Sequence, residues 1–360
     1  MTNLRNLSWE NAMAIEIIGT GRAVPSARVS NDDLAARIDT SDEWIRSHTG
    51  IGNRHICDAG TSTSDLAFEA AKNALAMACG YCGDDPDLRD KAAMEGAKSI
   101  GMIVVGTSTP DFMGTPSTAC LVQHRLGATN SGAMDVTAAC TGFIYGLETT
   151  AGLLTVGKKL KRALVIGAET LTKITDWSDR GTCVLFGDGA GAAVLEKTDT
   201  PADGAGRSGL IRTMLMADGS GAESLVIKRG GTRELFVAGE TVEKGVHIEM
   251  NGQEVYNFAV KAVTDTISAL LQDEGITADE LAWIVPHQAN ARIIQAAGKR
   301  LGIPAEKFFL NIEEYANTSA ASIPIAIDEL NRSGKLSKGD TIMTVGFGGG
   351  LTYGGNLIVW

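Results

Sequence analysis

The sequence lacks the features of a membrane-spanning, secreted or nucleic-acid-binding protein. It has no apolar run long enough to cross a bilayer, and its first dozen residues have neither the basic start nor the apolar core of a signal peptide. A formal net charge of −11 argues against a nucleic-acid partner. We therefore expect a cytoplasmic protein that binds neither membrane nor nucleic acid, with residues 1–13 as a polar N-terminal extension.

Cysteine is also scarce, because six cysteines in 360 residues do not make a disulfide framework. Two of them form the C-x-x-C sequence Cys79-Gly80-Tyr81-Cys82. In redox proteins such a pair opens a helix, whereas here it follows the helical pattern of residues 66–78 and falls at its end. No second C-x-x-C is present to complete a zinc site. We expect no metal and no cofactor, and a redox role for this pair stays an alternative.

What the chain has in quantity is glycine and small apolar residues. Hydrophobic residues make up 44% of the sequence, aromatic residues only 5%, and there are 43 glycines. This composition is typical of a globular α/β protein with many tight turns. The length suits two domains or one large α/β unit with a sizeable core.

One stretch, Met134 to Gly146, combines a short strand, a run of small residues and a helical pattern. Cys140 lies between the strand and the helix, so we expect it on a tight turn at the first helical turn. Free N–H groups and partial positive charge at a helix start favour a thiolate, which makes Cys140 a candidate nucleophile. The alternative is a small buried core residue, which describes most free cysteines.

The first half of the chain alternates strands and helices. Residues 83–99 are polar and charged, which indicates a surface insertion or a loosely packed helix. Ser62 and Asp65 form a capping box at a helix start. The remaining predicted elements are strands at 14–21, 101–106, 134–136 and 163–167, a helix at 118–126, and a hairpin-like pair at 182–186 and 191–195.

The second half repeats this order of elements. Asn317 then follows its strand as Cys140 follows residues 134–136, so the two residues are predicted on equivalent turns around a shared cleft. The elements expected in this half are a helix at 252–271, a strand at 283–285, a helix ending at 300–302, strands at 308–310, 342–345 and 356–360, and an amphipathic helix after 317–322.

Three polar side chains, Cys140, His287 and Asn317, stand where strands are predicted to lead into helices. The carboxyl ends of strands are where open α/β sheets bind ligands. A lone histidine after a proline is more often structural. Three such positions at matching places of a duplicated unit instead favour a catalytic site.

The sequence around these residues resembles the thiolase-like condensing enzymes, and most closely the β-ketoacyl-[acyl-carrier-protein] synthase III family. The resemblance covers nearly all of the chain after residue 13. It implies an α/β fold with duplicated halves, residues 14–205 and 206–360, that form a five-layered αβαβα sandwich. The matching segments are D-T-S-D-E-W-I at 39–45, D-V-T-A-A-C-T-G-F at 135–143, D-R-G-T at 179–182, F-G-D-G-A-G-A-A-V-L at 186–195, P-H-Q-A-N-A-R-I-I at 286–294, Y-A-N-T-S-A-A-S-I-P at 315–324 and G-F-G-G-G-L-T-Y-G at 346–354.

The resemblance implies a decarboxylating condensation in two stages that initiates fatty-acid synthesis. The Cys140 thiolate takes an acyl group from acyl-CoA, and malonyl-acyl carrier protein then loses CO₂ and attacks the acyl-enzyme. Negative charge develops on the thioester oxygen during CO₂ loss, and N–H groups of His287 and Asn317 can stabilise it. Backbone N–H groups of Cys140 and Gly349 match the oxyanion hole of the family.

Residues that contact CoA, the carrier and the acyl chain follow from the same resemblance. CoA is expected at Trp44, Arg180 and Asn290, although His48 stands where close relatives often have Arg, which changes one CoA contact. The helix after His287 places three basic residues on one face for an acidic carrier protein; the alternative is a solvated basic face. These residues are Arg292, Lys299 and Arg300.

The acyl pocket is expected at Thr115 and Phe347, with Thr115 reaching from one subunit of a homodimer toward the pocket of the other. Relatives specific for acetyl often have Phe at the position of Thr115. The smaller side chain predicts a pocket that admits primers longer than acetyl, unless Phe112 or Met113 fills the space.

Other condensing enzymes fit the sequence less well. A thiolase needs a second, C-terminal cysteine as base, and no cysteine follows position 183. Plant-type polyketide synthases and hydroxymethylglutaryl-CoA synthases share the Cys-His-Asn set but resemble the H-Q-A-N and N-T-S-A-A-S runs less. A synthase III-like enzyme of secondary metabolism, with another acyl donor or acceptor, is the remaining enzymatic alternative. A non-catalytic carrier-binding or redox protein is the alternative of a different class.

Overall fold

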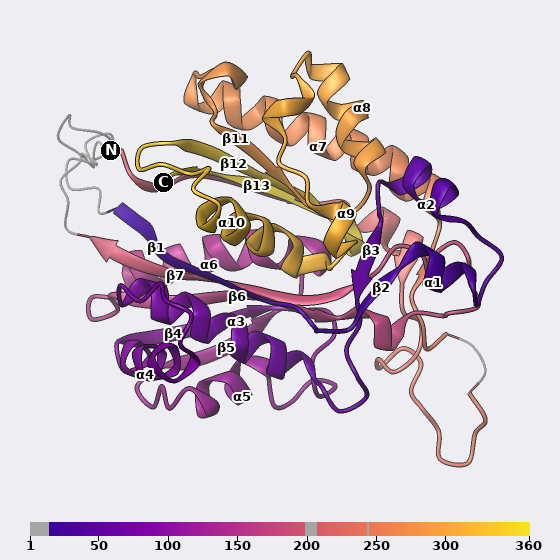
Figure 1. Ribbon diagram of the computed structural model, residues 1–360, viewed down its shortest axis with the longest axis horizontal. Coiled ribbons are helices and arrows are strands. Elements are labelled where there is room, and N and C mark those ends of the chain that lie inside the picture. Colours follow the sequence, from indigo (N-terminus) through magenta and orange to yellow (C-terminus); the bar gives the residue numbers. More distant parts are fainter. Residues whose placement is uncertain (1–13, 199–206, 243–244) are drawn as a thin grey trace, which may run out of the picture.

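The computed structural model describes residues 14–198, 207–242 and 245–360. Two expectations from the sequence, the polar extension at 1–13 and the boundary at 205/206, lie outside these residues. The described helices and strands stack in five layers, helix, sheet, helix, sheet and helix (Figure 1). None of the described helices is long and apolar enough to cross a membrane.

The first sheet is built from residues 14–198 and has the strand order β1-β7-β6-β4-β5. Its centre, β6, runs parallel to β4 and antiparallel to β7, and β4 runs parallel to β5. The strand predicted at 101–106 is β4. The bounds are β1 Ala14–Ala23, β4 Ile100–Gly106, β5 Gly132–Val136, β6 Arg162–Thr170 and β7 Asp188–Thr198.

The second sheet repeats the pairing pattern of the first. Its order is β11-β12-β13-β8, with β11 parallel to β12 and the other two pairs antiparallel. These four strands therefore match β4, β6, β7 and β1, and the duplication inferred from the sequence extends to strand direction. The bounds are β8 Gly209–Ala217, β11 Trp283–Pro286, β12 Thr341–Phe347 and β13 Thr352–Val359.

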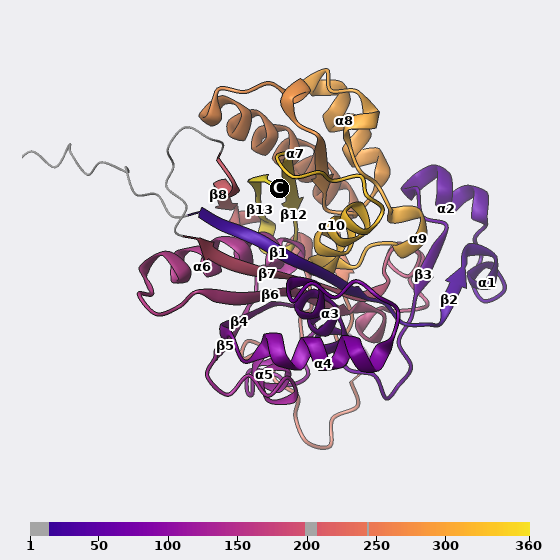
Figure 2. The same ribbon diagram turned by 60° about the vertical axis from the view of Figure 1, so that its left-hand side comes forward.

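Two helices, α6 Gly142–Val156 and α10 Ser322–Arg332, form the central layer between the sheets (Figures 1 and 2). Both are apolar on the faces that meet the sheets, and they share one core with residues of both sheets. Cys140 and Asn317 come just before these two helices in the chain, so both residues lie at the N-terminal end of the central layer.

The outer layers cover the remaining sheet faces. The helices α3 Thr63–Ala78, α4 Pro86–Ala97 and α5 Thr118–Arg125 form one core with the first sheet. The predicted capping box of Ser62 and Asp65 begins α3. On the other side, α7 Gly252–Glu274 and α8 Ala291–Leu301 form a core with the second sheet.

Several short elements lie outside the two large sheets. The helix α2 spans Asp42–Thr49. The side chain of its residue Ile45 packs in a separate buried cluster with Leu34 and Ile312. The others are β2 Arg28–Ser30, α1 Asn31–Ala35, β3 Asn53–His55, β9 Leu225–Val226, β10 Glu249–Met250 and α9 Ile312–Tyr315.

Two predicted strands are wrong. Residues 182–185 form turns and Phe186 makes only an isolated bridge with Asn317, while β7 pairs with β1 and β6. Residues 308–310 make only an isolated bridge, between Phe308 and Ile284. Leu310, the last of them, is 37% exposed. Of the two alternatives for residues 83–99, the structure has a helix, α4, which Asp85 caps and which buries Ala93 and Ala97.

Candidate active site

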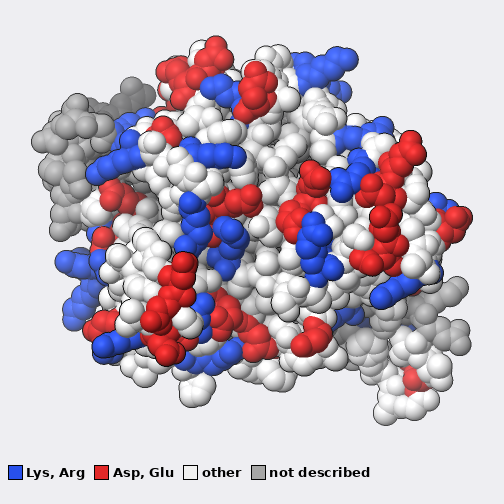
Figure 3. Space-filling view, in the orientation of Figure 1, with Lys and Arg blue, Asp and Glu red and all other residues white. Residues whose placement is uncertain are grey.

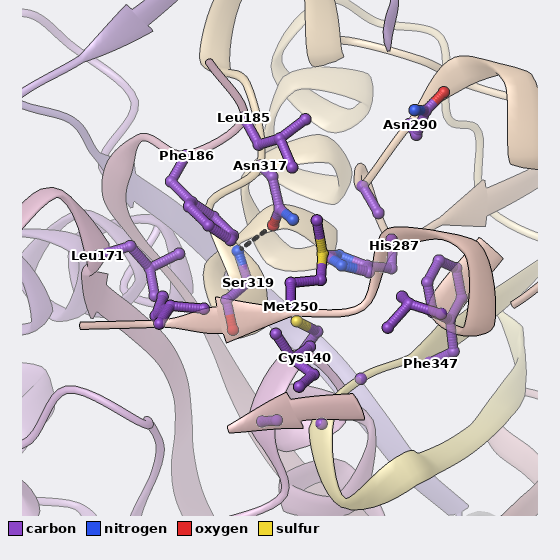
Figure 4. Close-up of a pocket in the computed structure, with 18 of the residues that line it drawn as sticks. Cys140, Leu171, Leu185, Phe186, Met250, His287, Asn290, Asn317, Ser319 and Phe347 are labelled. Atoms are coloured by element: carbon purple, nitrogen blue, oxygen red, sulfur yellow. Dashed lines mark hydrogen bonds between the residues drawn. The ribbon is translucent and has the colours of Figure 1, made fainter. Parts of the chain in front are cut away.

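A cavity of about 670 Å³ lies where the ends of the two sheets and the starts of the central helices meet. Cys140, His287 and Asn317 all line it, together with Phe347 and Gly349 (Figure 4). The three polar residues predicted from the sequence to share a cleft therefore do so. A cavity of this size can enclose much of a small organic ligand.

Cys140 follows β5 on a short 3₁₀ turn, Ala139–Thr141, that leads directly into α6. The strand-to-helix placement agrees with the sequence, while burial opposes the ionisation that a helix start favours. The pKa of the Cys140 thiol is raised to about 12, chiefly by burial; the Ser319 side chain acts to lower this pKa and the charge of Glu169 acts to raise it. Desolvation thus acts against the thiolate that the helix start favours.

The glycine-rich turn after β12 packs directly on Cys140. A Cβ at Gly348 would stand 2.6 Å from the Cys140 backbone N, so no larger residue fits there. Thr352 joins this turn to the nucleophile turn: its hydroxyl donates to the Ala138 carbonyl at 3.0 Å and lies 2.8 Å from the Thr141 hydroxyl. The predicted oxyanion-hole residue, Gly349, is next in the chain and lines the cavity.

His287 follows β11 and is held by both its backbone and its ring. Its N–H donates to the Val345 carbonyl at 2.7 Å, and its Nδ1 lies 2.8 Å from the Ser322 hydroxyl oxygen. The ring meets Phe347 edge to face, with centroids 5.4 Å apart. Burial lowers the pKa of His287 to about 3, so the imidazole is neutral and Nε2 is the ring nitrogen without a protein partner among the described residues.

Asn317 follows the short helix α9 rather than a strand, which corrects the expected strand at 308–310. Its Oδ1 accepts a hydrogen bond from the Ser319 backbone N at 2.9 Å (Figure 4). Its backbone N donates to the Leu185 carbonyl at 2.9 Å. With the amide oxygen occupied in this way, the amide N–H₂ is the end left for a ligand.

Glu169, near the end of β6, is a fully buried carboxylate beside these residues. It accepts hydrogen bonds from the hydroxyl of Thr109 at 2.6 Å and that of Ser319 at 3.0 Å. Burial raises the pKa of Glu169 to about 7 despite these bonds. The sequence analysis missed this residue, as it missed Ser319, Ser322 and Thr352.

The residues expected to hold CoA lie together at the cavity mouth. Arg180 stands over the Trp44 ring with its Cζ 5.8 Å from the centroid, and His48 stacks on the same indole at 4.5 Å. His48, which stands where close relatives often have Arg, therefore occupies the space beside the Trp44 ring. Asn290 also lines the cavity, yet its side chain caps α8 through the Arg292 N–H and donates to the His48 carbonyl at 3.0 Å.

The three basic residues expected to meet the carrier are all exposed on α8. Arg292 at the start of α8 lines the cavity, whereas Lys299 and Arg300 lie two turns away, roughly 10 Å along the helix axis. Figure 3 shows Lys and Arg side chains at the edge of the molecule where α8 lies, with acidic side chains on neighbouring surfaces. A basic face thus leads from the mouth of the cavity.

The two residues expected at the acyl pocket differ in exposure to solvent. Phe347 is buried and lines the cavity, which continues into an apolar cluster of Leu171, Phe186 and Ile248. Thr115 is exposed on the loop before α5 and does not line the cavity of its own chain.

Comparison with known proteins shows the family of this chain. Two family models match: 3-oxoacyl-[acyl-carrier-protein (ACP)] synthase III over residues 134–219 and its C-terminal part over residues 271–360. The chain is 46% identical to the β-ketoacyl-[acyl-carrier-protein] synthase III of Caldanaerobacter subterraneus subsp. tengcongensis and 48% identical to that of Clostridium perfringens strain SM101. Both alignments cover 97% of this chain and at least 98% of the relative.

Solved structures agree with these sequence matches. A 3-oxoacyl-[acyl-carrier-protein] synthase III from Aquifex aeolicus VF5 superposes with a TM-score of 0.81 at 39% identity, over 96% of this chain and all of the other. The priming β-ketosynthase of the R1128 polyketide pathway gives a TM-score of 0.82 at 32% identity, over 96% of both chains. The fold is thus the thiolase-like sandwich expected from the sequence, and the chain belongs to the β-ketoacyl-[acyl-carrier-protein] synthase III family of condensing acyltransferases.

Proposed function

We propose that the protein condenses an acyl-CoA primer with malonyl-acyl carrier protein, releasing CO₂ and giving a 3-oxoacyl-acyl carrier protein. This is the initiating step of fatty-acid synthesis. The observation that carries the proposal is the meeting of Cys140, His287 and Asn317 in one cavity of a chain that belongs to the synthase III family. No cofactor takes part, since loss of CO₂ itself supplies the carbanion.

In the first stage, the Cys140 thiolate attacks the thioester carbonyl and CoA leaves as its thiol. The close packing of Gly348 on Cys140 brings the turn that holds Gly349 beside the nucleophile. Two backbone N–H groups, those of Cys140 and Gly349, then stabilise the oxyanion of the tetrahedral intermediate. The apolar cluster beyond Phe347 holds the acyl chain.

In the second stage, His287 and Asn317 stabilise the enolate formed as malonyl loses CO₂. The Gln288 N–H already points at the Ser322 hydroxyl oxygen, 3.4 Å away, so the hydroxyl hydrogen is free to be donated to His287 Nδ1. A neutral imidazole with Nδ1 as acceptor carries its proton on Nε2. That proton and the Asn317 amide N–H₂ are the two donors to the enolate oxygen.

The partners follow from the surroundings of the cavity. Trp44 and Arg180 hold the adenine of CoA at the mouth, with Asn290 near the pantetheine. The basic face of α8 receives the acidic carrier protein. The enzyme acts in the cytoplasm as a homodimer, in which Thr115 of each chain borders the acyl pocket of the other.

The test is to incubate the protein with acyl-CoA and malonyl-acyl carrier protein and to measure the mass of the carrier. A 3-oxoacyl-carrier product supports the proposal. Transfer of the acyl group to a different acceptor, with no product on a fatty-acid carrier, favours an enzyme of secondary metabolism instead.

A further inference from the structure

Glu169 is a fully buried carboxyl group near the end of β6 that does not line the cavity and takes no part in the two-stage reaction. The turn after β4 supplies three of its donors: the Ser108 N–H at 3.1 Å, the Thr109 hydroxyl at 2.6 Å and the Thr107 hydroxyl at 3.3 Å. A further donor is the Ser319 hydroxyl, at 3.0 Å. Because a buried polar group is costly unless it is hydrogen-bonded, these donors fix the position of the carboxyl group.

Ser319 lies between this carboxyl group and the amide of Asn317. Its hydroxyl donates to Glu169 Oε1, while its backbone N donates to Asn317 Oδ1 at 2.9 Å (Figure 4). The second bond occupies the amide oxygen and leaves the amide N–H₂ for the enolate oxygen. The orientation of the amide therefore depends on how the backbone of Ser319 is held.

The backbone of Ser319 has a conformation that needs support. Its φ of 47° lies in the left-handed region, which a residue with a side chain keeps only where its surroundings hold it there. The strand β6 supplies such a hold twice. No side chain fits at Gly167, because a Cβ there would overlap the Ala320 carbonyl, and two residues further along Glu169 accepts from the Ser319 hydroxyl.

The matching turn in the first half, which begins at Ala139, is held from the opposite direction. The segment after β12, the strand that matches β6, packs on this turn at Gly348, and Thr352 in the same segment donates to the Ala138 carbonyl at 3.0 Å. Each of the two turns is thus held by residues at the end of a strand from the other half. Glu169 holds the second-half turn as Thr352 holds the first.

We propose that Glu169 is a positioning residue for the second stage: through the Ser319 hydroxyl it holds the turn whose N–H directs the Asn317 amide at the enolate oxygen. Glu169 does not touch the substrate, and its effect on the reaction passes through Asn317. A carboxylate and a carboxylic acid both offer an acceptor oxygen, so the bond to Ser319 does not require an ionised Glu169. This inference rests on Asn317 as an enolate donor in the proposed function.

The test is a double-mutant cycle on decarboxylation, measured as labelled CO₂ released from malonyl-acyl carrier protein. Ser319→Ala removes the hydroxyl but keeps the backbone N–H. It should slow decarboxylation by roughly ten- to a hundredfold, the cost of a group displaced by up to about 1 Å, and leave loading from acyl-CoA nearly unchanged. In the Asn317→Ala background the same substitution should have no further effect, because the amide through which Ser319 acts is gone.

Glu169→Gln is the conservative variant, since the oxygen of its side chain can still accept from Ser319. It should decarboxylate faster than Glu169→Leu, which should resemble Ser319→Ala. Asn356→Ala is the matched control for lost stability, because it breaks a hydrogen bond of a buried side chain to the Thr213 hydroxyl, away from the cavity. It should leave both half-reactions of the folded protein unchanged.

A crystal structure of the Ser319→Ala protein gives a readout that does not depend on activity. In it, Asn317 Oδ1 should have moved out of hydrogen-bond distance of the backbone N at position 319. An unmoved amide, equal losses in loading and decarboxylation, or additive losses in the double variant would overturn the positioning role. A wild type that takes no acyl group from acyl-CoA would overturn the proposed function instead, and the crystal structure would still decide the positioning role.

Discussion

Ala139 and Ser319 adopt nearly the same left-handed backbone, with φ of 45° and 47°, at matching positions of the two halves. Each begins a 3₁₀ turn that leads into a central helix, α6 or α10. Left-handed φ is uncommon for residues other than glycine, so the shared value marks one turn used twice. This register aligns Cys140 with Ala320 and Asn317 with Thr137. The turns are equivalent, as expected from the sequence, but the two catalytic positions within them differ by three residues.

Asn317→Ala should separate the two stages of the reaction. The amide is oriented toward the cavity by the Ser319 N–H, while Cys140 lies on the other turn. The variant should still accept an acyl group from CoA yet decarboxylate malonyl-acyl carrier protein at least a hundredfold more slowly, about what one oxyanion donor contributes. Release of labelled CO₂ from malonyl-carrier measures this, and a normal rate would refute the division of roles.

Charge reversal on α8 should affect the carrier alone. Arg300→Glu should raise the KM for malonyl-acyl carrier protein severalfold and leave loading from acyl-CoA nearly unchanged, because Arg300 lies about two turns from the cavity mouth. The wild-type KM should rise with salt, since exposed charges are screened beyond about 8 Å at physiological ionic strength. Lys338→Glu, an exposed reversal outside α8, is the control. Equal loss in both half-reactions would indicate a folding defect.

Primer length should depend on Thr115. In the proposed homodimer, a side chain smaller than Phe would leave room in the neighbouring subunit's pocket, and each further CH₂ buried there is worth about 0.8 kcal/mol. The wild type should use butyryl- or isobutyryl-CoA, and Thr115→Phe should shift the preference toward acetyl-CoA. Comparison of kcat/KM for the three primers measures the effect. A wild type that turns over acetyl-CoA alone would show that Phe112 or Met113 fills the space.

His287 should make the fold sensitive to acid. Its pKa is lowered to about 3 by burial, below the ordinary value of 6.5, so the unfolded chain binds its proton first. The contribution of His287 to the free energy of unfolding is fully present above pH 6.5. It is lost as the pH falls below that value, by about 1.4 kcal/mol per pH unit. Glu169, with a raised pKa, acts in the opposite direction. The free energy of unfolding of the wild type minus that of His287→Asn isolates the histidine, and this difference should fall by roughly 2–3 kcal/mol between pH 6.5 and 4.5. A constant difference would contradict the assignment.

The sequence predicted the duplicated order of elements and the cluster of Cys140, His287 and Asn317 because these depend on local patterns and on their repetition. The five layers were expected from the family resemblance. Prediction from the sequence failed where partners come from distant segments. The apolar residues 308–310 read as a strand, yet they meet only one bridge partner. Residues 182–186 read as half of a hairpin, but the Leu185 carbonyl is used by Asn317.

Glu169 shows the same limit at the site. Its sequence context is the end of an apolar strand, and nothing nearby in the chain reveals that turns at 107–109 and 319 will supply its donors. The environment of the Cys140 thiol has the same origin, because the helix start that favours a thiolate is local whereas the burial that raises the pKa of the thiol comes from the whole fold. Ser319 and Ser322 do lie in the quoted N-T-S-A-A-S run, so asking what its serines bond could have found them.

The most direct test of the account is the mass of the intact protein after incubation with a panel of acyl-CoAs, followed by identification of the labelled peptide. The wild type should gain one acyl group on Cys140. Cys140→Ser should keep the fold, because the site is small and the change nearly isosteric, and should load about a thousandfold or more slowly. Acyl labelling of the Cys140→Ser protein at the wild-type rate, or labelling at another residue, would contradict the account.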